Sequence, residues 1–303
     1  MTKKKNNLSR REFLNTTSWD SLTVTTKVNN RASESIQLNL NGDWDVCTSS
    51  SVRDFNAELT DAAKLLPETP WGPNEMGSVY NAMIAPLTPF TIKGVIWYQG
   101  ETNRFNHFIY KKLFTSLIED WREAWNDNFP FYFVQLAPYS WKTPQAWVRV
   151  QEAQLQCLSL PGTGMVVTND IGNTQNIHPD NKEQVGERLA NWALAKTYHK
   201  TGIACSGPIY RQMKIEGSQI RVCFDYAEQG LLSRGGELTH FQIAGEEWVF
   251  VEAEARIDGS TVIVSSRRIK HPKAVRFAWS NDAEPNLFNR EGLPASWFRT
   301  DTM

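Results

Sequence analysis

Strands and helices alternate along the middle of this sequence, and their order is the feature that most constrains the fold. Apolar runs typical of buried strands occur at 92–97, 131–136 and 164–168. Helical patterns follow them, from about 105 to 125, 145 to 158 and 181 to 198. In the first helix, apolar side chains recur every four residues and predict one apolar stripe: Phe105, Ile109, Leu113, Leu117, Trp121 and Trp125. This alternation predicts an α/β fold with a parallel sheet covered by helices.

The pattern changes near residue 206, after which strand signals follow one another without a long helix. The runs are IRVCF (220–224), WVFVEAEARI (248–257), STVIVSS (260–266) and AVRFAW (274–279). Asp258-Gly259 predicts a hairpin turn between two of them. We therefore expect three parts: a polar stretch at 1–40 that is poorly ordered, a core at 41–205 and a β-rich C-terminal module at 206–303.

Composition and charge exclude several classes of partner. The net charge is −1, which offers no electrostatic case for binding nucleic acid or an anionic membrane, and no apolar run is long enough to span a bilayer. The four Cys form neither a C-x-x-C pair nor a cluster with His, so we expect no metal site. Twelve Trp fit core packing, although loops such as Ser140-Trp141 would also suit stacking on sugars.

Two loops after predicted strands carry reactive side chains. The first is Gln99-Gly100-Glu101-Thr102-Asn103, and the second is Asn176-Ile177-His178-Pro179. Ligands of open parallel sheets bind at the carboxyl ends of the strands, where both loops lie. There His178 is placed as a general base, and Glu101 is the candidate carboxylate that orients it. Each motif alone is more typical of an ordinary turn, and Asp180 with Glu183 predicts a capping box at the next helix.

Several longer segments carry a family resemblance. They are YNAMIAPLTPFTIKGVIWYQGETN (80–103), FPFYFVQLAPY (129–139), VQEAQLQCLSLPGTGMVVTNDIGNTQNIHPDNKEQVGERLANWALAKTY (150–198) and NLFNREGLPASWFRTD (286–301). With these segments the chain resembles the sialate O-acetylesterase family, within the SGNH-hydrolase group of serine esterases. The resemblance implies a doubly wound parallel sheet and an esterase, without cofactor, that removes O-acetyl groups from sugars such as sialic acid or xylan.

The resemblance also implies roles for the two loops. A Ser would attack the ester carbonyl, with His178 as its base. Many SGNH enzymes carry the triad Asp three residues before the His, but here that residue is Gln175, so the carboxylate role passes to Glu101. Gln99, with Gly100 and Asn103, would line the oxyanion and substrate pocket. The expected partner is an acetylated carbohydrate, and no pattern indicates an oligomeric state.

The nucleophile is the missing piece. The family's Gly-Gln-Ser-Asn segment occurs nowhere in the 303 residues, and its second glycine-rich donor block is also missing. Residues 42–57 resemble the family stretch between those two blocks, and the sheet is expected to be incomplete. Possible substitutes lack a strand-to-helix turn around them or fit an ordinary helix start: Ser49, Ser50, Ser51 and Ser78.

Two hypotheses remain. The chain is an esterase whose nucleophile is supplied unconventionally or by another chain, or it is a truncated, catalytically dead relative that binds sugars. A scaffold role has no positive feature. The N-terminal Ser9-Arg10-Arg11 resembles a twin-arginine export signal without the following apolar region. As it stands, this start predicts a cytoplasmic protein, although many relatives are exported.

Overall fold

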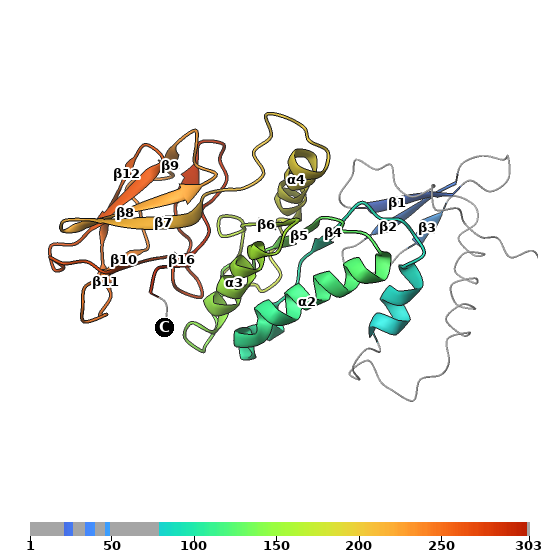
Figure 1. Cartoon of the computed structure of the whole chain (residues 1–303), viewed down its shortest axis with the longest axis horizontal. Coiled ribbons are helices and arrows are strands. Elements are labelled where there is room, and N and C mark those ends of the chain that lie inside the picture. Colours follow the sequence, from blue (N-terminus) through green and yellow to red (C-terminus); the bar gives the residue numbers. More distant parts are fainter. Residues whose placement is uncertain (1–20, 27–33, 40–45, 49–78, 302–303) are drawn as a thin grey trace, which may run out of the picture. The chain divides into compact units, whose positions relative to one another are not determined.

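The computed structural model of the chain describes residues 21–26, 34–39, 46–48 and 79–301 (Figure 1). The chain divides into two compact units, Met1–Val95 with Ile118–Phe129 and Ile96–Leu117 with Pro130–Met303. Among the described residues, no helix combines the length and the apolar character that crossing a bilayer requires. The candidate serines at 49–51 and 78 and the N-terminal arginines lie outside the described residues.

In the first unit, three short strands form an antiparallel sheet in the order β1-β2-β3. The strands are β1 (Ser21–Thr26), β2 (Glu34–Asn39) and β3 (Val46–Thr48). Thus two strands fall within the stretch expected to be poorly ordered, and the rest of 1–40 lies outside the described residues. Two short helical turns follow, η1 (Tyr80–Ile84) and η2 (Ala85–Leu87).

A second sheet has the order β4-β5-β6, and its strands correspond to the three predicted strand runs. They are β4 (Val95–Trp97), β5 (Phe131–Val134) and β6 (Thr163–Val166). β5 and β6 pair in parallel. The connecting helices are α2 (His107–Trp125), α3 (Ala146–Gln156) and α4 (Lys182–Trp192), all within the helical stretches read from the sequence.

Side chains of β5 alternate between two helix-covered faces, as the period of a strand requires. Phe131 and Phe133 contact Phe114 of α2 edge-to-face, with ring centroids 5.7 and 5.2 Å apart. On the opposite face, Tyr132 and Val134 of β5 belong to a hydrophobic cluster that also includes residues of β6 and α4. These residues are Val166, Val185, Leu189 and Trp192. Helices therefore cover both faces, which confirms the doubly wound α/β class.

Two local predictions, the buried stripe of α2 and the cap of α4, were wrong by one residue. In α2 the buried side chains are Tyr110, Phe114 and Ile118, whereas Phe105 is 67% exposed and Leu113 49% exposed. Both stripes are apolar at four-residue spacing, so periodicity alone cannot tell which one faces the sheet. At α4 the cap is Asn181, whose side-chain oxygen accepts from the backbone N–H of Gln184, and not the predicted Asp180.

The C-terminal strands form a four-stranded sheet in the order β12-β13-β8-β7 and a second in the order β11-β10-β14-β16. The first contains β7 (Ile209–Glu216), β8 (Gln219–Asp225), β12 (Glu254–Asp258) and β13 (Thr261–Ser265). The second contains β10 (Phe241–Ala244), β11 (Val251–Glu252), β14 (Ala274–Phe277) and β16 (Phe298–Arg299). A further pair joins β9 (Leu231–Ser233) to β15 (Leu287–Asn289).

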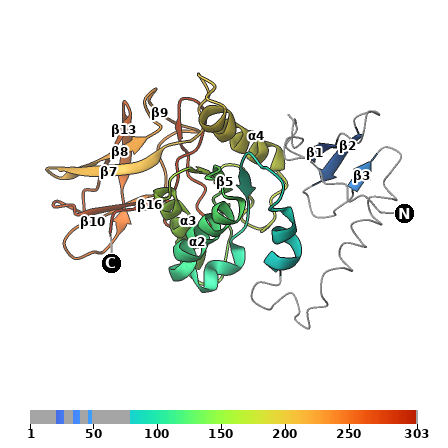
Figure 2. The ribbon, with the colours of Figure 1, turned by 45° about the vertical axis from the view of Figure 1, so that its right-hand side comes forward.

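Aromatic contacts join the two larger sheets. Phe298 of β16 stacks on Tyr210 of β7, with ring centroids 4.8 Å apart, and meets Phe224 of β8 edge-to-face at 5.8 Å. Figure 2 shows the strands gathered beside α3 and α4. They belong to the same compact unit as β5 and β6, so the division after residue 205 stays a prediction.

The predicted turn at Asp258-Gly259 is confirmed, because β12 and β13 pair through it and Gly259 has a φ of 63°. The run at 248–257 was predicted as one strand but contributes to both sheets. It breaks at Ala253, between β11 and β12. The pattern of side chains does not reveal this break. β11 and β12 differ in the strands with which they pair, and pairing partners are not visible in a local sequence pattern.

We expect Gly164→Ala to destabilise the fold. A Cβ atom at Gly164 would lie 2.4 Å from the Trp192 ring, which is itself held by a hydrogen bond from its Nε1 to the Met165 carbonyl. Overpacking of this kind costs about 1–3 kcal/mol of unfolding free energy. Urea unfolding would measure it. In a Trp192→Phe background the added cost should shrink, and additive losses would contradict the clash.

Candidate active site

Three loops leave the carboxyl ends of the parallel strands and form one edge of the sheet. The first contains the short helical turn η3 (Glu101–Phe105), after β4. The second runs from 135 to 145 after β5, and the third runs from 167 to 181 between β6 and α4. The edge is therefore where both motifs of the sequence analysis lie.

The corner between β4 and η3 is held by two side chains that donate hydrogen bonds to its backbone. The carbonyl oxygen of Gln99 accepts from the Tyr110 hydroxyl (3.3 Å) and from Nε2 of Gln154 (3.4 Å). Gly100 follows with a φ of 151°, and a Cβ there would lie 3.3 Å from both of those donor atoms. Glycine is required at this corner because it fits both the backbone angle and the close approach.

Glu101 begins η3 and is half-buried. One of its carboxylate oxygens accepts the backbone N–H of Gly100 at 2.9 Å. The carboxylate also lies close enough to Lys182 to raise the pKa of that ammonium, although burial has the larger effect and the pKa of Lys182 is lowered overall. Lys182 is the first residue of α4. The charge of Glu101, at the corner after β4, therefore acts on the start of α4.

Tyr98 connects the same two elements. The Lys182 ammonium lies 4.9 Å from the centre of the Tyr98 ring. Burial is the main reason that the pKa of the Tyr98 hydroxyl is raised to about 12, and a hydrogen bond with Thr168 opposes that shift. The end of β4 therefore reaches the end of β6 through Tyr98.

His178 lies in the loop before α4, with an exposed side chain. Its backbone N–H donates to the side-chain oxygen of Asn176 at 3.0 Å, and the following Pro179 is buried. Within 79–301, no hydrogen bond or ion pair joins His178 to Glu101. The loops that carry both residues leave the same edge of the sheet, and the two side chains are not in contact.

The amides expected to line the pocket are engaged locally. The N–H of Gly100 is bonded to Glu101, and the side-chain amide of Asn103 donates to Asn106 at 3.1 Å. The Gln99 side chain is exposed. In the described part of the chain, no group of three or more His, Cys, Asp or Glu is placed to hold a metal ion.

The loops after β5 and β6 are tied to each other. The backbone N–H of Ser140 donates to the Thr174 carbonyl at 2.9 Å, and Nε2 of Gln175 donates to the Ser140 hydroxyl at 3.3 Å. Gln175 is the residue that stands where many SGNH enzymes carry an Asp. Here its amide joins two loops, three residues before His178.

Asn281, far along the chain, organises the loop after β5. Its side-chain oxygen accepts the backbone N–H groups of Trp147 (3.0 Å) and Val148 (3.3 Å) at the start of α3. Its amide donates to the carbonyls of Trp141 (3.2 Å) and Thr143 (2.9 Å). The helix needs this cap because Gln145, at its own cap position, is left-handed and makes no side-chain cap bond.

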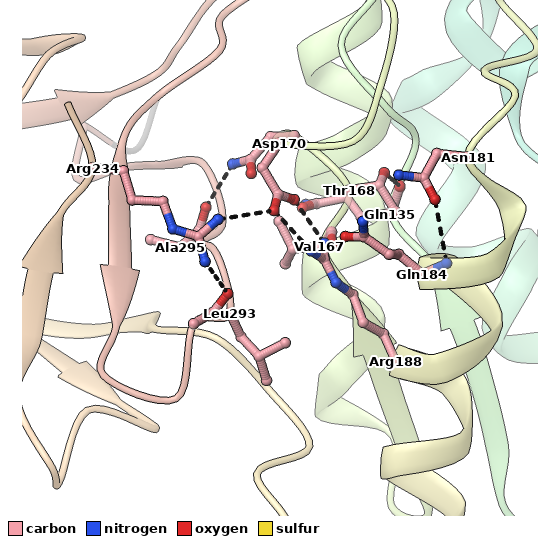
Figure 3. A network of polar contacts seen from close by, with 12 residues as sticks. Gln135, Val167, Thr168, Asp170, Asn181, Gln184, Arg188, Arg234, Leu293 and Ala295 are labelled. Atoms are coloured by element: carbon pink, nitrogen blue, oxygen red, sulfur yellow. Dashed lines mark hydrogen bonds and ion pairs between the residues drawn. The ribbon is translucent and has the colours of Figure 1, made fainter.

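A buried ion pair fixes the loop that carries His178 (Figure 3). Both guanidinium Nη atoms of Arg188 contact the Asp170 carboxylate at 2.7 Å, and one also donates to the Val167 carbonyl at 2.6 Å. The two side chains are only 9% and 10% exposed. Arg234 approaches the same carboxylate at 3.9 Å.

Sequence reasoning missed Asp170, Arg188 and Asn281. Arg188 had a detectable signal, because it falls in the apolar stripe of α4 between Val185 and Trp192. A cation in such a stripe predicts a buried partner. Asn281 had none, because its partners lie more than a hundred residues earlier in the sequence.

The sequence and the structure of the chain were compared with those of known proteins. A family model described as carbohydrate esterase, sialic acid-specific acetylesterase matches residues 63–195. A solved carbohydrate acetylesterase from Xanthomonas citri is 42% identical, with a TM-score of 0.70 over 74% of this chain and 54% of that one. These matches support the sialate O-acetylesterase family for this chain. Its parallel sheet with a β-rich C-terminal part fits the SGNH-type fold expected from the sequence.

Two mammalian family members match over shorter stretches. The mouse sialate O-acetylesterase is 33% identical over 48% of this chain and 31% of its own length. The human one is 32% identical over 56% of this chain and 34% of its own length. The chain thus spans about a third of these relatives. The family segment 63–195 includes both the corner at Glu101 and the loop of His178, whose roles remain proposals.

We expect Arg188→Met to lower the free energy of unfolding by about 3–5 kcal/mol, because it leaves the Asp170 carboxylate buried without its partner. Thermal or urea unfolding would measure the loss. Arg211→Met is a matched control, since Arg211 pairs with Asp225 at 3.6 Å and is 56% exposed; it should cost less than about 1 kcal/mol. Equal losses in both variants would contradict the argument.

Proposed function

We propose that this chain provides the base and the substrate-binding loops of an esterase that removes O-acetyl groups from sugars. His178 is the general base, and Glu101 is the carboxylate that orients it. The observation that carries the proposal is that both loops leave one sheet edge, in a chain that matches a carbohydrate esterase family. The edge also fits the rule that ligands of such sheets bind at the carboxyl ends of strands.

The reaction follows serine-esterase chemistry. A Ser hydroxyl attacks the acetyl carbonyl and forms a bond to carbon, while the His178 imidazole takes the hydroxyl proton. The tetrahedral intermediate collapses, the sugar oxygen leaves and receives that proton, and the acetyl group remains on the Ser. Water then repeats the attack with His178 as base and releases acetate. Glu101 would tighten onto the imidazole when substrate is bound, since catalytic hydrogen bonds are often long in unliganded enzymes.

The pocket residues act by polarising the carbonyl. Gly100 and Asn103, with Gln99, line the place where negative charge develops on the carbonyl oxygen. The backbone N–H of Gly100 donates to the Glu101 carboxylate. If that carboxylate accepted a hydrogen bond from His178 instead, the Gly100 N–H would become available to the substrate. A single donor of this kind contributes about 2.7–4 kcal/mol of transition-state stabilisation.

A second candidate function is sugar binding without turnover. It is favoured by one observation, the absence of Gly-Gln-Ser-Asn from the 303 residues. Under the first proposal the nucleophile is supplied by another polypeptide or unconventionally, and under the second it is not supplied at all. The two differ in what happens when the nucleophile segment is provided.

The chain alone should release acetate from an aryl acetate and from O-acetylated sialic acid at close to the spontaneous rate. Loss of the Ser lowers kcat of a serine hydrolase by about a millionfold. Acetate release would be measured beside the His178→Ala variant. Robust turnover that His178→Ala abolishes would show that another residue of this chain acts as the nucleophile.

Adding a separately produced segment with the family's Gly-Gln-Ser-Asn strand should restore turnover. In that mixture, Glu101→Gln should lower kcat by about 10⁴-fold and His178→Ala by about 10⁶-fold, by analogy with other triads. Glu183→Gln is the matched control, an exposed carboxylate in the first turn of α4. Full activity of Glu101→Gln would remove Glu101 from the mechanism. Binding of the segment without any turnover would favour the sugar-binding function.

A further inference from the structure

Two neighbouring loops of the β-rich module form one surface. The first loop, between β10 and β11, spans 245–250, and the second, between β13 and β14, spans 266–273. The backbone N–H of Lys273 donates to the Ala244 carbonyl at 2.7 Å, and a Cβ at Gly245 would lie 3.2 Å from the His271 carbonyl oxygen. The two loops therefore lie against each other, and we call them together the paired-loop surface.

The first loop exposes two adjacent apolar side chains. Trp248 is 56% exposed and Val249 is 62% exposed. Trp248 has a φ of 55°, a left-handed conformation that is uncommon for a bulky residue, and its N–H donates to the Gly245 carbonyl at 3.1 Å. Strained turns and exposed apolar groups are both typical of surfaces that bind a partner.

The second loop is dense in cations. Five of the seven residues from 267 to 273 are basic and exposed: Arg267, Arg268, Lys270, His271 and Lys273. Within 79–301 only one of them forms an ion pair, Lys273 with Glu246 of the first loop at 3.2 Å. Across both loops, four Lys or Arg stand against two Glu, so the paired-loop surface carries a surplus of positive charge.

Contacts below the surface hold its two loops in place. At the end of the first loop, the Arg276 carbon Cζ lies 3.8 Å from the centre of the Phe250 ring, and Arg276 pairs with the buried Asp301 at 2.6 Å. In the second loop the N–H of Ile269 donates to the Ser266 carbonyl at 3.0 Å and closes a turn with the two arginines at its centre. The apolar and cationic groups are therefore presented together.

This combination of groups fits an anionic lipid bilayer better than a soluble polyanion. Trp favours the interface between headgroups and hydrocarbon, and anionic headgroups attract Lys and Arg near the bilayer surface. Val249 decides between the two partners, because an aliphatic side chain gains from leaving water but offers no ring for a base to stack on. The net charge of −1 conceals the local surplus, since acidic residues elsewhere in the chain cancel it.

We propose that the paired-loop surface binds anionic lipid bilayers peripherally. Trp248 and Val249 enter the headgroup region, while the arginines and lysines of the second loop contact the phosphate and carboxylate groups of the lipids. The inference does not rest on the proposed function, because none of these residues belongs to the loops of the candidate site.

The experiment sediments the full chain with vesicles of phosphatidylcholine, prepared with and without phosphatidylserine. The chain should bind the anionic vesicles about thirtyfold more tightly than the neutral ones, because each of the two surplus cations contributes about fivefold. Added sodium chloride should reduce the preference by screening. Absence of binding to the anionic vesicles would overturn the proposal.

The cationic part is tested by a double variant, Arg267→Gln with Arg268→Gln, which should remove most of the preference for anionic vesicles. The matched control is Lys111→Gln with Lys112→Gln, because it removes the same charge from two exposed side chains of α2. The control should keep the preference. Equal losses in the two double variants would assign the binding to a general positive field and overturn the proposal.

The apolar part is tested by Trp248→Asn, which should fold because Asn tolerates a left-handed backbone. The variant should bind anionic vesicles about tenfold more weakly at unchanged charge. Ile215→Thr is the matched control, since Ile215 is 47% exposed on β7, and it should bind like the native chain. An unchanged affinity of folded Trp248→Asn, or binding to polyuridylate as tight as to the vesicles, would overturn the lipid assignment.

Discussion

The bidentate pair between Asp170 and Arg188 is the interaction on which the candidate site depends. It closes the segment from the end of β6 to the middle of α4, and His178 lies between the two partners. A buried pair of this kind is weak evidence for net stability, because desolvation offsets much of the attraction. Its geometric effect is firmer, since two planar groups joined by two hydrogen bonds leave the ends of the loop little freedom.

Distant parts of the chain hold the remaining loops. Asn281 caps α3 and fixes the loop of Trp141, and Asn169 donates to the Ala295 carbonyl at 2.7 Å. The Ser296 hydroxyl donates to the Gln135 side chain at 3.0 Å. These contacts join the β-rich module to the carboxyl edge of the parallel sheet. The module therefore contributes to the site as a support for loops that carry reactive groups.

Likeness to the family and catalytic ability are separate properties of this chain. The family match covers the segment that carries Glu101 and His178, and the nucleophile motif is absent from the 303 residues. A base and a binding surface can be retained without the nucleophile, because they belong to different loops of the fold.

The order of strands and helices in the core, and the turn at Asp258-Gly259, were determined by the sequence alone. Hydrophobic period and turn chemistry are local properties, and they act within one element. Only the tertiary structure decided which stripe of α2 is buried, that the run at 248–257 divides between two sheets, and that Asn281 caps a helix more than a hundred residues away. The approach of Glu101 to Lys182 at the start of α4 was likewise decided by the tertiary structure. Such choices depend on the partner that each side chain finds in space, and a partner distant in the chain leaves no periodic trace in the sequence.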